Sequence, residues 1–185
     1  PYTKINSKWI KDATIYMIKR FYFLCFFLLC MITATAQIQR RILGFTLGVT
    51  TKAQVLNYLK NHHYKYSLRK NGEYVASNIT FAGYNWQDTY FSFYKGKLYC
   101  VDFRDDGEYT PEELLTEVWD RVKNSLNRKY SLYSISSKDD NIEFSDNKTY
   151  VGLKYKYIFG SKSLSIMYFD IYLFNQCSNS EYNEL

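Results

Sequence analysis

The stretch from Asn78 to Arg104 constrains the fold most, because it offers the most apolar surface on which a flanking helix can pack. Its second half predicts a β-hairpin whose large side chains all occupy odd positions: Phe91, Phe93, Tyr99, Val101 and Phe103. These side chains share one sheet face only if the loop has an odd number of residues. A three-residue loop, Tyr94-Lys95-Gly96, meets that condition and places a glycine where a left-handed residue closes the turn. The predicted register pairs Phe91 with Tyr99 and puts four residues on the other face: Tyr90, Ser92, Leu98 and Cys100.

The N-terminal region has the three parts of a secretory signal peptide. Met17 is the expected start, Lys19-Arg20 is the charged part, and residues 21–32 are the apolar part, followed by Ala34-Thr35-Ala36. We expect cleavage before Gln37, which leaves residues 37–185 as a periplasmic or secreted protein. The apolar run is shorter than the about 20 residues that span a bilayer. An uncleaved segment that anchors the chain in the membrane is the alternative.

The charge of the chain argues against a nucleic-acid partner. The full sequence has 24 basic and 18 acidic side chains. Residues 1–36 hold five of the basic and one of the acidic side chains, so residues 37–185 carry 19 against 17. Nucleic-acid binding needs a clustered basic face, and no basic run follows Arg41.

Two cysteines, Cys100 and Cys177, remain after the expected cleavage. In an oxidising compartment an even number of cysteines suggests a disulfide. Such a bridge would close a long loop and add about 4 kcal/mol by the chain-entropy estimate. The alternative is two unpaired thiols, one on a strand and one in the C-terminal tail.

Two helix starts are evident from the sequence. Thr51 and Gln54 form a capping box, and the helix that follows ends near Asn61. Thr110 is the expected N-cap of a second helix, in which Pro111 is the first residue and an apolar stripe runs to about Arg128. Strands are predicted after each helix, at 64–68, 73–76, 78–104, 130–135, 142–144, 150–159 and 164–174, with a polar tail from residue 175.

This order, a helix and then antiparallel strands, occurs twice. We therefore predict an α+β protein in which two similar halves, about 47–105 and 106–176, form one compact domain with the helices packed on an antiparallel sheet. No linker rich in Pro, Gly or Ser separates the halves.

The segment Leu47 to Leu56, LGVTTKAQVL, resembles an element that opens helices in two groups of proteins. These are the secreted beta-lactamase inhibitor proteins (BLIP-like) and the BamE/SmpA outer-membrane assembly lipoproteins, with their Gly-x-Thr-x-x-Gln-Val pattern. The chain has one extra residue between Gly48 and Gln54, and the second helix lacks the glycine. It is also similar to bacterial envelope proteins in which such a helix precedes a Phe-Ala-Gly-Tyr strand. The resemblance implies a binding or assembly role, whereas a turn and a helix cap are its purely structural interpretation.

No motif for catalysis, a metal or a cofactor is present in the sequence. His62-His63 is the only histidine pair and has no nearby Cys or carboxylate at metal-ligand spacing. The acidic cluster from Asp102 to Glu108 is too short for a calcium loop of the EF-hand type. It is interpreted as a solvated turn at a helix N-terminus, and a weak cation site is the alternative.

Three aromatic residues, Tyr84, Trp86 and Tyr90, are predicted to lie on the outward face of the sheet. Aromatic side chains with a polar tip are favoured in interfaces. The expected function is therefore non-enzymatic binding of a protein partner in the cell envelope through these residues. A glycan-binding module and a small exported hydrolase are the alternatives. A second layer that covers this face would make the three residues part of the core.

Overall fold

The computed structural model describes residues 17, 19–21, 37–158 and 161–182. Residues from Ile38 onward belong to one compact unit. The predicted signal peptide lies almost entirely outside the described residues, so the structure does not bear on it. Within the described residues, no helix combines the length and the apolar character needed to cross a bilayer.

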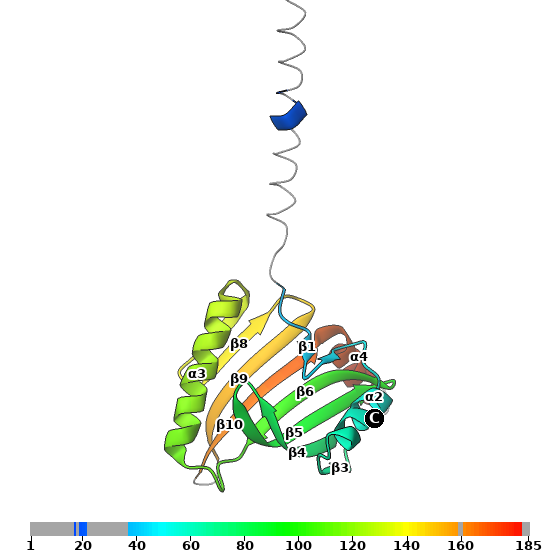
Figure 1. Cartoon of the computed structure of the whole chain (residues 1–185), viewed down its shortest axis with the longest axis vertical. Coiled ribbons are helices and arrows are strands. Elements are labelled where there is room, and N and C mark those ends of the chain that lie inside the picture. Colours follow the sequence, from blue (N-terminus) through cyan, green and yellow to red (C-terminus); the bar gives the residue numbers. More distant parts are fainter. Residues whose placement is uncertain (1–16, 18, 22–36, 159–160, 183–185) are drawn as a thin grey trace, which may run out of the picture. The chain divides into compact units, whose positions relative to one another are not determined.

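An eight-stranded antiparallel sheet dominates this unit, with the strand order β3-β4-β5-β6-β10-β9-β8-β7 (Figure 1). Its strands are β3 (Tyr66–Leu68), β4 (Tyr74–Phe81), β5 (Tyr84–Tyr94), β6 (Lys97–Asp105), β7 (Ser134–Ser137), β8 (Asn141–Ser145), β9 (Thr149–Ile158) and β10 (Ser161–Asp170). A two-stranded ribbon precedes them, formed by β1 (Arg41–Ile42) and β2 (Phe45–Thr46). The predicted α+β class with an antiparallel sheet is confirmed.

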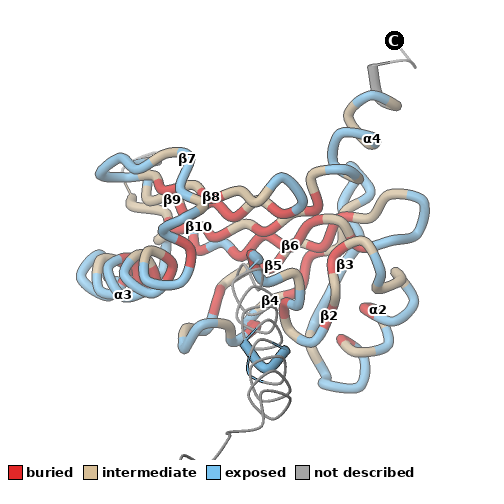
Figure 2. The backbone as a smooth tube through the Cα atoms, turned by 90° about the horizontal axis from the view of Figure 1, so that it is seen from above, coloured by how far each residue is buried: buried red, intermediate tan, exposed pale blue. Residues whose placement is uncertain are grey.

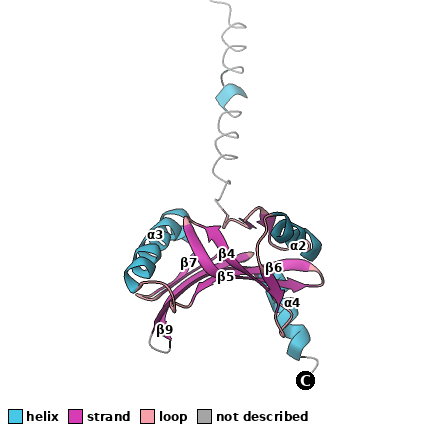
Figure 3. Ribbon diagram, turned by 60° about the horizontal axis from the view of Figure 1, so that its bottom comes forward, coloured by secondary structure: helices cyan, strands magenta, loops and turns pink. Residues whose placement is uncertain are grey.

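Two helices, α2 (Lys52–Asn61) and α3 (Glu112–Tyr130), lie on one face of the sheet, and α4 (Ile171–Tyr182) lies on the other side (Figure 3). The capping box of α2 forms as predicted, between Thr51 and Gln54. The predicted N-cap of α3 is wrong. Thr110 donates its hydroxyl to Asp105 Oδ2 at 2.9 Å instead, and Pro111 occupies the cap position without a side-chain bond.

Buried residues concentrate in the central strands and on the inner face of α3 (Figure 2). The apolar stripe of α3 is buried as predicted, and Trp119 and Tyr130 join it. A short 3-10 helix, η1 (Ser131–Tyr133), connects α3 to β7.

The β5–β6 hairpin has a different register from the predicted one. Tyr94 pairs with Lys97 across a two-residue turn, and Phe91 pairs with Val101 rather than with Tyr99. The register shifts next to Ser92, where Tyr99 is the extra residue of a β-bulge. The extra residue in a bulge reverses the alternation of side chains on its strand. This reversal compensates for the even-numbered loop, so Phe91 and Val101 still share the buried face. Leu98 joins them instead of facing outward.

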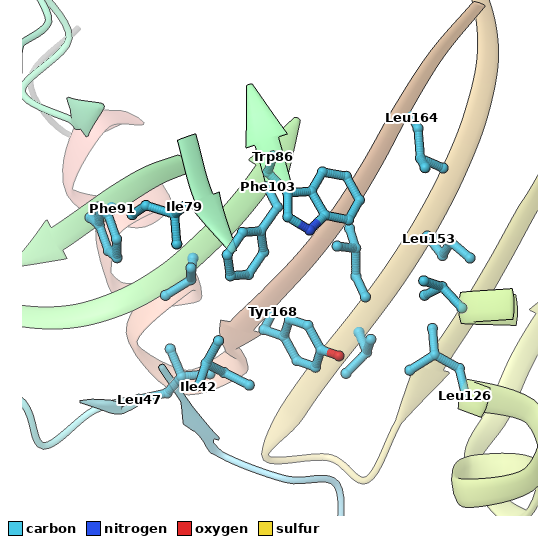
Figure 4. Close-up of a cluster of buried hydrophobic side chains, with 14 of the residues drawn as sticks. Ile42, Leu47, Ile79, Trp86, Phe91, Phe103, Leu126, Leu153, Leu164 and Tyr168 are labelled. Atoms are coloured by element: carbon cyan, nitrogen blue, oxygen red, sulfur yellow. The ribbon is translucent and has the colours of Figure 1, made fainter. Parts of the chain in front are cut away.

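The outer end of the β4–β5 hairpin bends over the helix-side face of the sheet (Figure 1). Asn78 has a left-handed conformation, with a φ of 61°, at the point where β4 leaves the plane of the sheet. Beyond it the ring of Phe81 stacks on Phe103 at 4.3 Å between centroids. The core therefore lies between α2, α3 and this hairpin (Figure 4).

The C-terminal segment is a helix, not the continued strand and polar tail that the sequence predicts. Asp170 ends β10, and its Oδ1 accepts a hydrogen bond from the Leu173 N–H at 2.9 Å, which caps α4. Its other carboxylate oxygen pairs with Arg40. Phe174 of α4 then packs against Phe169 on the face of the sheet opposite α2 and α3.

Candidate functional site

A polar groove of about 470 Å³ lies on the open face of the sheet, opposite α2 and α3. Residues of β5, β6, β9 and β10 line it, and we call it the open-face groove. Its charged lining residues are Asp88, Asp102, Arg104, Asp105, Asp106, Lys154 and Lys156. Asp88, Asp102, Arg104, Lys154 and Lys156 face the groove because side chains alternate along a strand. In β6, for example, Val101 and Phe103 are buried in the core and Asp102 lies on the other face. Asp105 and Asp106 line the groove from the end of β6.

Asp102 is the most enclosed acid of the groove, with 6% of its surface exposed. Its Oδ2 accepts a hydrogen bond from Arg104 Nε at 2.6 Å and forms an ion pair with Arg104 Nη2, also at 2.6 Å. Its Oδ1 has no partner among the described residues. Burial raises the pKa of the Asp102 carboxyl above its usual value, and the guanidinium of Arg104 opposes that shift. The groove therefore contains a carboxyl oxygen that is out of bulk water and unsatisfied.

Arg104 connects this acid to an aromatic side chain. Its guanidinium lies 4.4 Å from the centroid of the Tyr90 ring, which is a cation–π distance. The Tyr90 hydroxyl is 3.5 Å from Asp88 Oδ2. The side chain of Arg104 is nevertheless 53% exposed, so it is oriented by Asp102 and Tyr90 while part of it remains accessible to a ligand.

Two lysines from β9 supply the basic side of the groove. Lys154 pairs with Ser165 and Lys156 with Ser163 across the β9–β10 ladder. Among the described residues, the ion pairs are Arg40–Asp170, Arg104–Asp102 and Lys162–Glu112, and neither groove lysine takes part in one. Acids and Arg104 from β5 and β6 thus face unpaired ammonium groups from β9.

The predicted disulfide between Cys100 and Cys177 is not formed, and both cysteines are free. Cys100 is buried next to Asp102, and burial together with the Asp102 and Glu73 carboxylates raises the pKa of its thiol. Cys177 on α4 is placed beside the hydroxyl of Tyr99 instead.

The predicted aromatic surface of Tyr84, Trp86 and Tyr90 is wrong as a unit. Trp86 is 0% exposed, and its indole N–H donates to the Phe81 carbonyl at 3.0 Å. Tyr84 is half-buried and donates its hydroxyl to Asp105 Oδ2 at 2.5 Å. Burial and this bond raise the Tyr84 pKa to about 12. The bend in the hairpin turns Trp86 into the core, so only Tyr90 lines the open-face groove.

The acidic cluster of the sequence is divided by the fold. Asp105 also accepts bonds from the Gly107 N–H and the Thr110 hydroxyl, so it organises the turn before α3. Asp102 lies three residues earlier in the middle of β6. No group of three or more potential metal ligands occurs among the described residues.

Sequence reasoning missed three residues of the groove, Arg104, Lys154 and Lys156, and it assigned Asp102 to a solvated turn. The signal was present in part, because Lys154 and Lys156 alternate with apolar residues along β9. What the sequence lacks is the pairing of β6 with β10, which brings the two polar rows onto one face.

Comparison with models of protein families, with curated proteins and with solved structures gave no match. The function must therefore be inferred from the geometry of the chain itself.

Proposed function

We propose that this chain is an exported, non-enzymatic protein of the bacterial envelope that binds a protein partner in the open-face groove. The observation that carries this proposal is the buried carboxyl of Asp102, whose Oδ1 has no partner in the described part of the chain although the groove is open to a ligand. The signal-peptide pattern before Gln37 supports export.

The chemistry of the groove defines what it can bind. An unsatisfied buried acceptor costs about 1–3 kcal/mol, and a partner that donates a hydrogen bond to Asp102 recovers that cost. Lys154 and Lys156 need acceptors, for which a carboxylate or a backbone carbonyl is suitable. A polypeptide segment supplies donors and acceptors together, so a protein satisfies both sides of the groove.

The two alternatives fit less well. Sugars stack on open aromatic faces, but the guanidinium of Arg104 covers the Tyr90 ring on one side. A hydrolase with a cysteine nucleophile needs a thiolate, whereas burial raises the pKa of Cys100 and keeps the thiol protonated. Both alternatives are outcomes of the test below.

We further propose that residues 47–105 and 106–176 are similar halves. Each half has a helix followed by four strands, and the runs β3-β4-β5-β6 and β10-β9-β8-β7 meet where β6 pairs with β10. The groove would then be made by both halves. The resemblance of Leu47–Leu56 to the BLIP-like and BamE/SmpA proteins is consistent with a tandem arrangement.

The test is affinity capture from an envelope extract of the source cells, with the chain as bait. The variant removes the positive charges of the two groove lysines (Lys154→Gln with Lys156→Gln). The matched control removes two exposed lysines elsewhere (Lys60→Gln with Lys65→Gln). A stoichiometric partner that is retained by the control and lost by the groove variant supports the proposal. Equal capture by both variants, or no captured protein at all, contradicts it, and screening for glycan binding and for hydrolysis would follow.

A further inference from the structure

The helix-side face of the protein contains a second hollow, separate from the open-face groove. It has a volume of about 390 Å³, within the range of about 300–1,000 Å³ for small-molecule sites. We call it the α3 pocket, because α3 forms one wall, β10 forms the floor, and the bent β4–β5 hairpin and the ribbon β1–β2 close the other side.

The inside of the α3 pocket is apolar. Val122 and Leu126 of α3 face Ile166 of β10 and Phe81 of the hairpin. Burial of apolar ligand surface in such a lining provides the general driving force for binding, about 25 cal/mol per Å².

The hydroxyl of Tyr168 also lines the pocket. Tyr168 is 5% exposed, and no described residue forms a hydrogen bond with its hydroxyl. In Figure 4 this hydroxyl projects into the space between Ile42 and Leu126, which both line the pocket. Unlike Asp102 Oδ1, this hydroxyl is not among the fully buried atoms without a partner in the described chain, so solvent or a ligand in the pocket can reach it.

The mouth of the pocket is basic. Arg121, Arg128 and Lys129 line it, and no acidic side chain does. Arg121 is 3.3 Å from the Gly83 carbonyl and Lys129 is 2.5 Å from Gln39 Oε1, so both are held at the rim by neutral groups. None of the three cations forms an ion pair within the part of the chain that the structure describes.

The basic mouth extends along α3. Arg121, Ser125 and Arg128 are four and three residues apart, so they follow one edge of the helix. At a rise of 1.5 Å per residue, the span from Arg121 to Arg128 is about 10 Å. A mouth of this length suits an extended chain.

From these features we infer that the α3 pocket binds a single-chain anionic amphiphile of the fatty-acid class. The hydrocarbon chain lies between α3 and β10, and the carboxylate lies at the basic mouth within reach of the cationic side chains. This activity is independent of the protein-binding groove, because it uses the opposite face of the sheet.

The test is a fluorescence titration of the full chain, purified without detergent, with cis-parinarate as the probe. Dodecanoate and the uncharged dodecanol then compete for the site. Saturable binding is expected, with dodecanoate about tenfold more effective than dodecanol, since one charge-assisted contact contributes at least about 1.4 kcal/mol. Absence of saturable binding, or equal competition by the acid and the alcohol, overturns the inference.

Variants of the mouth test the role of its positive charges. Arg121→Gln with Arg128→Gln should abolish the preference for dodecanoate over dodecanol. The control Lys60→Gln with Lys65→Gln, which lies on and next to α2, should keep it. The variant Lys154→Gln with Lys156→Gln should also bind dodecanoate normally, which separates this site from the open-face groove. An unchanged preference in the Arg121 and Arg128 variant contradicts the inference.

Discussion

The replacement of Trp86 by alanine is expected to destabilise the protein strongly, because the fold places this indole in the core. A tryptophan side chain buries about 200 Å², which corresponds to about 5 kcal/mol at 25 cal/mol per Å². Alanine retains part of that burial, but the cavity and the unpaired Phe81 carbonyl add to the loss. We therefore expect the free energy of unfolding to fall by about 3–5 kcal/mol.

The assay is urea unfolding followed by circular dichroism, so that the removed fluorophore does not affect the signal. Tyr90→Ala is the matched control on the open face, where the contact with Arg104 contributes about 0.5–1 kcal/mol. If the free energy of unfolding of Trp86→Ala is within about 1 kcal/mol of the wild-type value, the hairpin does not fold over the core and Trp86 is a surface residue.

Three further predictions follow from single side chains. Asp102→Asn should stabilise the protein at neutral pH. The raised pKa of Asp102 makes its ionisation unfavourable in the fold. Its contribution to the free energy of unfolding is therefore fully present in acid and is lost as the pH rises from the ordinary carboxyl pKa of about 3.9. Urea unfolding at several pH values should show that the difference in stability between wild type and variant disappears in acid. Thr51→Ala should lower the free energy of unfolding by about 1 kcal/mol because α2 loses its capping box. An unchanged urea midpoint would mean that the cap does not contribute to stability. Under native conditions, a thiol reagent should modify Cys177 well before Cys100, whose burial raises its pKa; equal rates would refute the buried position.

Local patterns in the sequence predicted most of the secondary structure. The capping box at Thr51 and the stripe from Leu115 to Leu126 depend on interactions within about four residues, which a sequence displays directly. The strands predicted at 64–68 and 73–76 correspond to β3 and to the start of β4 for the same reason. The α4 helix was missed because Asp170, its cap, follows an alternating strand with no Gly or Pro to mark the change.

The candidate site was predictable only in part. Alternation along β9 separates Lys154 and Lys156 from the core residues, and alternation along β6 does the same for Asp102. Their meeting depends on the β6–β10 ladder, a contact between residues about 60 positions apart. The error at Trp86 has a similar origin, because the alternation rule assumes a straight strand and the bend at Asn78 breaks it.

The sequence by itself determined the class of this protein, the positions of its first two helices and the apolar faces that form the core, because these follow from periodicity and from short-range hydrogen bonding. Tertiary structure alone decided which polar side chains meet and which aromatic residues are buried. Those outcomes depend on strand order, a bulge at Tyr99 and a bent hairpin, all of which are set by packing between distant segments.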